Sequence, residues 1–194
     1  MHPLTWHPPV EASSMNTAPL SYWHRTASPF ALFSRLPSSV ETVVIGGGLL
    51  GTATCYWLAK AGVDVALLER EALAFGATGR NGGFVRIGPA GSYLEAKERL
   101  SAETARLFPS LRPQLHVAAR WAGLMGCVSD SHPIVDVAPG LPGVFFVGGF
   151  SGHGMPFGLR LGQLLAESVT SGSLVADLWP FRLHRPSLLP WPHS

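Results

Sequence analysis

The chain has 194 residues, of which 46% are hydrophobic and only 13% are charged. This composition is typical of a folded domain with a core of ordinary size, and it excludes a disordered chain. The formal net charge is +2 and no run of lysine or arginine stands out, which argues against nucleic acid as the main partner.

The first predicted elements form a βαβ unit that follows a surface arm. The aromatic residues of segment 21–39 suggest an arm laid on the domain. A strand is predicted over 41–45, a helix over 49–60 with Gly62 placed to cap its end, and a second strand over 63–69. The second strand is almost entirely apolar, as expected of a parallel strand that is buried on both faces.

The second half of the chain is predicted to hold two further strands and two helices. A glycine-rich loop at 76–84 precedes a charged helix at 92–107, and residues 115–126 read as a strand entering a turn. An apolar strand is predicted at 143–149 and an amphipathic helix at 156–171, ended by the glycine that follows it. One side of this helix gathers Phe157, Leu161, Leu164, Leu165 and Ser168.

The sequence VVIGGGLLG at 43–51 has the spacing of a dinucleotide-binding turn. Gly46 permits a tight turn out of the strand, Gly48 lets a pyrophosphate approach the backbone, and Gly51 allows close packing of the helix. Glu69 ends the next strand, where a carboxylate accepts hydrogen bonds from ribose hydroxyls. The pattern predicts adenine dinucleotide binding, and the alternative is a structural glycine turn with a surface glutamate.

Other classes of site find little support in the sequence. Cys55 and Cys127 lack CxxC spacing and are interpreted as small buried hydrophobes in a reducing compartment. Residues 137–159 have no charged side chain, but seven glycines and three prolines exclude a lipid-facing helix there. The histidines show no metal-site spacing, and the N-terminus does not read as a signal peptide, so we expect a cytoplasmic protein without a metal.

Several motifs in order resemble the D-amino-acid oxidase-like (DAO) superfamily of FAD-dependent oxidoreductases. They are VVIGGGLLG, LLEREALAFGATGRNGGFV, RWAGLMG with a downstream PIV, and GVFFVGGFSGHGMPFGLRLGQLLAES. The superfamily includes glycine and sarcosine oxidases, and SYW near the start and LWPF near the end are similar to its gamma-glutamylputrescine oxidase branch. The resemblance implies FAD rather than NAD as the cofactor, and an α/β fold with a Rossmann-like parallel sheet.

The resemblance also implies which residues hold the cofactor. The segment matching residues 77–83 passes beside the pyrophosphate and the flavin ring, where Arg80 offsets phosphate charge unless it is a solvated loop cation. The N-terminus of the last helix points near the pyrimidine side of the flavin, where His153 donates a hydrogen bond unless it is a turn residue. The expected cofactor-binding set is Gly46, Gly48, Leu49, Leu50, Gly51, Glu69, Arg70, Ala77, Thr78, Gly79, Arg80, Asn81, Gly82, Gly83, Gly149, Gly152, His153, Gly154 and Met155.

The resembling proteins are about twice as long and carry a substrate domain that has no counterpart here. Its place falls at a junction near 104–109, and the substrate domain is therefore expected to be largely absent. We expect a mobile tail at 1–20, an FAD-binding domain at 21–183 built from segments 21–107 and 108–183, and a C-terminal tail at 184–194. No residue is assigned to substrate binding or catalysis.

The functional expectation is oxidation of the C–N bond of an amine or amino acid by hydride transfer to flavin. A second hypothesis is a non-catalytic FAD-binding remnant or half-protein, whose missing layer is supplied by a protein partner or by a homo-oligomer. A third is an NAD-binding module, which the segments GATGRNGG and SGHGM disfavour. With one flavin face open to water, we expect weak or absent amine turnover.

Overall fold

The computed structural model describes residues 20–27, 37–83 and 121–188. The charged helix predicted at 92–107 lies outside these ranges, as do most of the predicted N-terminal tail and the end of the C-terminal tail. Among the helices described, none has the length and hydropathy needed to span a bilayer.

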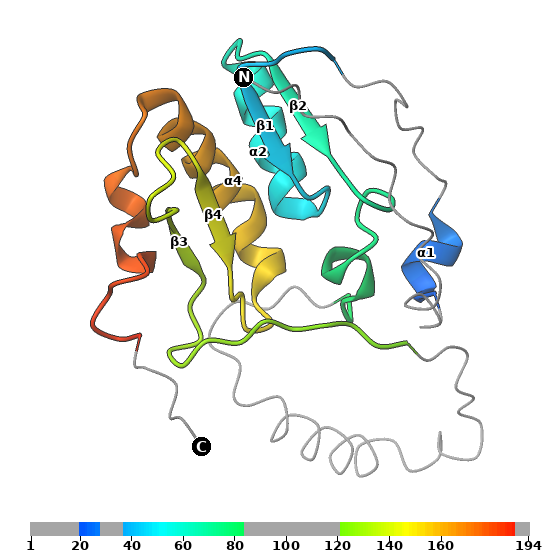
Figure 1. Ribbon diagram of the computed structural model, residues 1–194. Helices are drawn as coiled ribbons and strands as arrows, with labels where there is room; N and C mark the ends of the chain where they lie inside the picture. The colour runs from blue at the N-terminus through cyan, green and yellow to red at the C-terminus, as the bar shows by residue number, and fades with distance from the viewer. Residues whose placement is uncertain (1–19, 28–36, 84–120, 189–194) are drawn as a thin grey trace, which may run out of the picture.

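The first half forms the expected βαβ unit (Figure 1). Strand β1 (Thr42–Ile45) pairs in parallel with β2 (Val65–Leu68), and helix α2 (Leu49–Lys60) connects them. Gly62 follows α2 with φ +84°, a left-handed conformation that suits glycine, so the predicted bounds and end of this helix are confirmed. Both strands are shorter than predicted.

The burial on both faces that was predicted for the second strand is wrong for β2. All four residues of β2 are only partly buried, and in β1 Val43 is 49% and Ile45 84% exposed. Helix α2 packs on β1 and β2, and β1 has β2 as its one hydrogen-bonded neighbour in the described part of the chain. Among the described residues, the strands are therefore covered by a helix on one face only.

The second half is an antiparallel strand pair backed by a long helix. Strand β3 (Ile134–Val137) pairs with β4 (Phe145–Gly148), and α4 (Gly154–Ser171) follows and ends at Gly172 with φ +73°. The structure thus confirms the α/β class and the last helix. It also adds β3, which was not predicted as a strand.

Two further segments differ from the prediction, one before β3 and one after α4. Residues 121–126, the described part of the predicted strand at 115–126, form no strand, because their hydrogen bonds go to loops rather than to a ladder. The 3-10 helix η3 (Ala176–Phe181) corresponds to no predicted element, and it inserts Leu178 into the core.

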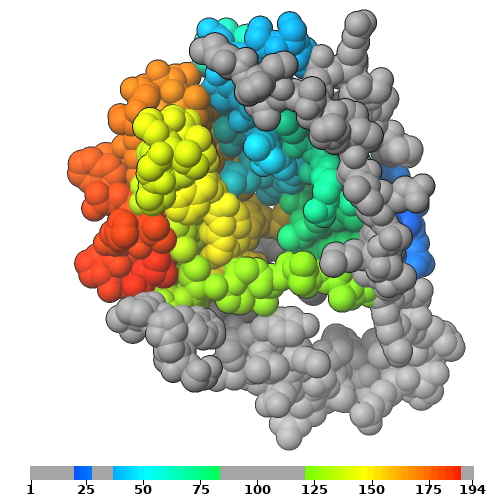
Figure 2. Space-filling view, viewed as in Figure 1, coloured from blue at the N-terminus to red at the C-terminus, as the bar shows by residue number. Residues whose placement is uncertain are grey.

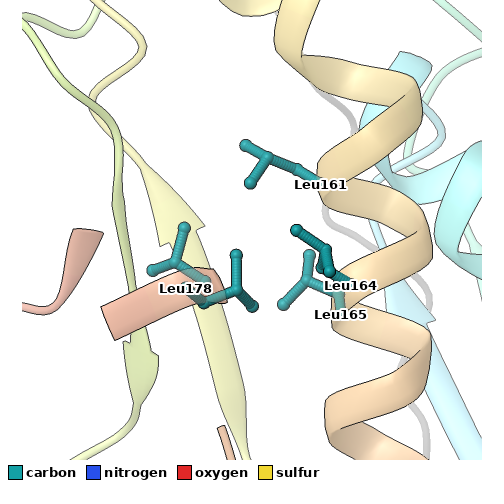
Figure 3. Packing of buried hydrophobic residues seen from close by; sticks show 5 residues of the cluster. Leu161, Leu164, Leu165 and Leu178 are labelled. Carbon is teal, nitrogen blue, oxygen red and sulfur yellow. The ribbon is translucent and has the colours of Figure 1, made fainter. Parts of the chain in front are cut away.

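The core lies between α4 and the β3–β4 pair. Leu161, Leu164 and Leu165 on α4 face Leu178 from η3 (Figure 3), and Val135 of β3 completes the buried cluster. Three of the five residues on the predicted apolar side of the helix are in this cluster, Ser168 is fully buried, and Phe157 packs against it. The amphipathic pattern therefore predicted the buried side correctly.

Helices α2 and α4 join the two halves of the chain. Gly158 and Gly162 on α4 face α2 so closely that a Cβ at Gly158 would lie 2.6 Å from Leu49 Cδ2, and one at Gly162 would lie 2.6 Å from Ala53 Cβ. Such small-residue spacing lets two helix backbones approach, and it fixes the two strand pairs relative to each other.

Candidate functional site

The carboxyl ends of three strands point to the same side of the molecule. Figure 1 shows β1, β2 and β4 running in this direction, with α2 and α4 beginning at that side. In open α/β sheets, ligands bind beyond the carboxyl ends of the strands, and helix N-termini there favour anions. All the predicted site residues follow one of these three strands or stand in the 77–83 segment.

The turn after β1 is a backbone cradle. Gly46 has φ +106°, and a Cβ at Gly51 would stand 1.9 Å from the carbonyl oxygen of Gly46. The N–H of Leu49 donates to Thr78 Oγ1 at 3.0 Å. The N–H groups of Leu50 and Gly51 donate to no described residue, so the first turn of α2 keeps donors for an anion.

Glu69 closes this cradle from the end of β2. One carboxylate oxygen accepts the N–H of Gly47 at 2.6 Å and the other accepts the N–H of Glu71 at 2.9 Å. Partial burial opposes ionisation, but the backbone N–H donors of Glu71, Gly47 and Arg70, together with the Arg70 charge, hold the pKa of Glu69 below its ordinary value. The Arg70 side chain points to solvent and pairs with Glu71 at 3.5 Å.

The 77–83 segment connects the two halves of the site. Its first part is a 3-10 helix, η1 (Ala77–Arg80), where an open loop was predicted. The Asn81 amide nitrogen donates to the carbonyl oxygen of Thr78 and lies 3.7 Å from Met155 Sδ, while its Oδ1 accepts the N–H of Gly83 at 2.7 Å. Thr78 contacts the start of α2 and Asn81 the start of α4, so this segment spans both helix N-termini.

Arg80 holds a third segment against this region. Its guanidinium lies over the Phe75 ring at 5.2 Å and donates to the carbonyl oxygen of Ala122 at 3.3 Å. Its own carbonyl oxygen accepts the indole N–H of Trp121 at 3.1 Å. The predicted role of Arg80 in offsetting phosphate charge stays a prediction, and these contacts give it a second role in positioning residues 121–122.

The N-terminus of α4 forms the other wall. His153 is its N-cap residue, and the Nε2 atom of this histidine is buried without a hydrogen-bond partner among the described residues. Ser151, with φ +49°, donates its N–H to the carbonyl oxygen of Gly126 at 2.8 Å, and its hydroxyl accepts the N–H of Val128 at 3.1 Å. A Cβ at Gly152 would stand 3.1 Å from Met125 Sδ.

These features fit a bound dinucleotide. Figure 2 shows the surface hollowed between the cyan and green first segment and the yellow segment at β4, with the light-green residues after 120 along one side. Two helix N-termini supply partial positive charge and N–H donors, and the unpartnered His153 Nε2 supplies a further polar group. The glycines keep side chains out of the approach to the backbone at Gly46 and Gly48.

Sequence reasoning missed some residues that shape this region. Trp121, Ala122 and Ser151 were part of family motifs, but none of them had an assigned role. Ser21 and His24 contact Gly79 across 58 and 55 residues of chain, a separation for which a single sequence carries no signal. The Gly158-x-x-x-Gly162 spacing was visible and predicts close helix packing.

A family model described as "FAD dependent oxidoreductase" (DAO) matches residues 41–108 and 88–168. The two matches together cover both halves of the site, from the start of β1 to near the end of α4.

Three curated relatives match shorter stretches. Gamma-glutamylputrescine oxidoreductase from Escherichia coli is 43% identical over 65 residues, which is 32% of this chain and 15% of that protein. N-methyl-L-tryptophan oxidase from Citrobacter koseri is 32% identical over 90 residues, covering 44% of this chain and 24% of that protein. Mitochondrial sarcosine dehydrogenase from mouse is 55% identical over 51 residues, 26% of this chain and 6% of that protein. The chain thus matches less than a quarter of the length of each of these relatives.

Proposed function

The chain belongs to the DAO family of FAD-dependent oxidoreductases, and from this premise we propose that it oxidises the C–N bond of an amine or amino acid. The observation that supports this is the convergence of the α2 N-terminus, the 77–83 segment and the α4 N-terminus beside the carboxyl ends of β1, β2 and β4. FAD is the cofactor of the family, and the fit of these residues to a dinucleotide supports a site for it here.

The turn after β1 takes the adenine half of the cofactor in this proposal. The free N–H groups of Leu50 and Gly51 bind the pyrophosphate, with the positive end of the α2 dipole behind them. Glu69 is held ionised by its backbone donors and accepts a ribose hydroxyl. Its existing bond to Gly47 keeps the carboxylate within reach of the cradle.

The start of α4 faces the reactive half. Bound FAD would supply the hydride acceptor for oxidation at the carbon next to the substrate nitrogen. His153 Nε2, in the tautomer that carries its proton, and the N–H groups at the start of α4 would stabilise negative charge there as preorganised donors. Met155 and Asn81 fix the distance between this helix and the 77–83 segment.

The substrate class is proposed from the relatives, whose names refer to gamma-glutamylputrescine, N-methyl-L-tryptophan and sarcosine. All three are small amines or amino acids, so we propose a substrate of this kind. The described residues include no group that we assign to substrate recognition. A cytoplasmic location stays a prediction from the sequence.

The first test is a titration of the purified full chain, stripped of cofactor, with FAD and in parallel with NAD. We expect saturable FAD binding with a protein-bound flavin spectrum and no comparable binding of NAD. A folded chain that takes up no FAD would refute the proposed function. Replacing Glu69 by Gln is expected to weaken FAD binding about tenfold, equivalent to about 1.4 kcal/mol, whereas the neighbouring Glu71→Gln leaves it unchanged.

A second test separates an active oxidoreductase from a non-catalytic FAD-binding remnant or half-protein. The FAD-loaded chain is incubated with sarcosine, glycine, D-amino acids and acylated polyamines, and flavin bleaching is followed without oxygen. Bleaching that depends on the amine supports the proposed activity. FAD binding with no bleaching by any of these amines supports the remnant or half-protein.

A further inference from the structure

Helix α1 (Tyr22–Thr26) packs against the 77–83 segment on the side away from α4 (Figure 1). This contact joins residues about 58 positions apart in the chain and belongs to neither the glycine turn nor the start of α4. We propose that Ser21 and His24 are positioning residues, which hold the 77–83 segment in the geometry required to bind FAD. The proposal rests on the proposed function, because it assigns a role toward the same cofactor.

Ser21 is the centre of the contact. It is fully buried, and its hydroxyl donates to the carbonyl oxygen of Gly79. The same hydroxyl accepts the N–H of His24 at 3.2 Å and lies 2.9 Å from His24 Nδ1, which also accepts the N–H of Ser21 at 3.3 Å. This reciprocal capping box orders the short helix and directs the serine hydroxyl at the carbonyl group of Gly79.

His24 adds a steric contact to the hydrogen bonds. Its ring packs on Phe75 with the centroids 5.1 Å apart, and its buried Nε2 would lie 2.6 Å from a Cβ at Gly79. Phe75 in turn lies under the Arg80 guanidinium. Gly79 and Arg80 are thus held from one side by the α1 residues and by the ring that His24 packs against.

Trp23 makes an independent contact at the other end of the segment. Its indole N–H donates to the carbonyl oxygen of Asn81 at 3.0 Å, and its ring lies against Gly83. Residues 79, 81 and 83 are therefore all in contact with α1. On the opposite side, Thr78 accepts from Leu49 and Asn81 approaches Met155. Because the segment is short, a shift on the α1 side moves the groups that contact both helix N-termini.

The experiment compares Ser21→Ala, Ser21→Thr and the matched control Thr26→Ala in the full chain. Among the described residues, the Thr26 hydroxyl bonds only to carbonyl oxygens of α1 itself, so its loss leaves the 77–83 segment untouched. We expect Ser21→Ala to raise the dissociation constant of FAD about tenfold and to change the visible circular dichroism of the bound flavin at saturating FAD. Ser21→Thr keeps the hydroxyl and is expected to restore both readouts, and Thr26→Ala to behave as the wild type.

The outcomes distinguish this proposal from its premise. If the wild type binds FAD but Ser21→Ala binds it equally well with an unchanged flavin spectrum, the positioning role is overturned even if thermal stability falls. If the wild type itself binds no FAD, both proposals fail. If Ser21→Ala does not fold, His24→Ala decides, since it removes the ring that packs on Phe75 and lies against Gly79, and unchanged FAD binding by that variant overturns the proposal.

Discussion

The carbonyl oxygen of Gly46 lies directly against the Cα of Gly51, in the space that a side chain at residue 51 would fill. A Cβ built there stands 1.9 Å from that oxygen, and the neighbouring atom is backbone, which cannot rotate away. The same approach brings the first turn of α2 to the end of β1 and leaves the N–H groups of Leu50 and Gly51 facing the candidate site. The packing of α2 against the end of β1 therefore depends on the absence of a side chain at residue 51, and in the proposed function cofactor binding depends on it as well.

Replacing Gly51 by Ala is expected to destabilise the chain by about 3 kcal/mol or more, because the backbone of β1 or α2 must shift. The measurement is the free energy of unfolding in denaturant, together with an FAD titration. Gly148→Ala is the matched control for stability, since a Cβ there meets nothing within 4 Å and the extended backbone of β4 suits alanine. Wild-type stability and FAD affinity in Gly51→Ala would contradict the assigned geometry.

The packing of α4 on α2 leads to a second prediction. In a helix interior, alanine is favoured over glycine by about 1 kcal/mol, so a helical Gly→Ala change in open space stabilises. At Gly162 the new Cβ would lie 2.6 Å from Ala53 Cβ and 2.9 Å from the backbone N of Thr54. We therefore expect Gly162→Ala to lower the free energy of unfolding by ~1–3 kcal/mol despite its better helix propensity.

Gly154→Ala is the control for this prediction, measured without added FAD. A Cβ at Gly154 meets only ordinary contacts, the nearest at 3.6 Å, and the residue begins the same helix. Its stability is expected to stay near that of the wild type. A Gly162→Ala chain that is more stable than the wild type would show that the two helices do not approach as described.

Local patterns in the sequence predicted the parts of the fold that depend on neighbouring residues. The 3.6-residue period over 156–171 predicted α4 and its buried side, and the glycine spacing after β1 predicted the turn and the start of α2. These elements are set by propensity, amphipathicity and special backbone angles. Such causes act over a few residues and are visible in one sequence.

Contacts between distant segments were not predictable in the same way. Strand β3 is only four residues long and contains Asp136, whose carboxylate accepts the N–H groups of Val137 and Leu183. Nothing in that short stretch indicates a partner 47 residues away. Val43 and Ile45 are exposed although they belong to an apolar strand. An apolar strand pattern indicates a tendency to be buried, but it does not identify the segment that covers the strand.

A buried ion pair anchors the C-terminal segment. Arg185 binds Asp130 through two parallel hydrogen bonds of 2.6 and 2.7 Å, with the two side chains 5% and 10% exposed. The guanidinium also donates to the carbonyl oxygens of Pro133, Phe181, Arg182 and His132. Replacing Arg185 by Met is expected to cost about 3–5 kcal/mol of unfolding free energy, because the Asp130 charge stays buried without its partner.

The exposed pair of Arg160 and Asp177 provides the control. Its atoms are 3.2 Å apart, but the side chains are 57% and 64% exposed. Arg160→Met is expected to cost at most about 1 kcal/mol, since solvent screens such pairs. Equal losses for Arg160→Met and Arg185→Met, measured by the same denaturant titration, would contradict the buried character of the Arg185 pair.

The Asp130 carboxyl also makes the free energy of unfolding depend on pH, because its pKa differs between the folded and the unfolded chain. The hydrogen bonds from Arg185 hold its pKa well below the ordinary value of 3.8, with those from Ser187 and His132 assisting against desolvation. In the folded chain this group therefore releases its proton more readily than in the unfolded chain. Its stabilising contribution is complete above the unfolded pKa and is lost as the pH falls below about 4 toward the folded pKa.

The free energy of unfolding of the wild type and of Asp130→Asn, measured between about pH 6 and pH 3, tests this linkage. The difference in unfolding free energy between the two chains is expected to be largest at about pH 6 and to decrease as the pH falls through about 4. The reason is that protonation of Asp130 in the wild type removes the same negative charge that the Asp130→Asn substitution removes. Glu69, whose pKa is also lowered, is present in both chains and cancels in the difference. Asp177→Asn serves as the control, because its unfolding free energy is expected to differ little from that of the wild type at every pH. A gap between wild type and Asp130→Asn that stays constant over this whole range would mean that the Asp130 charge does not hold the C-terminal segment in place.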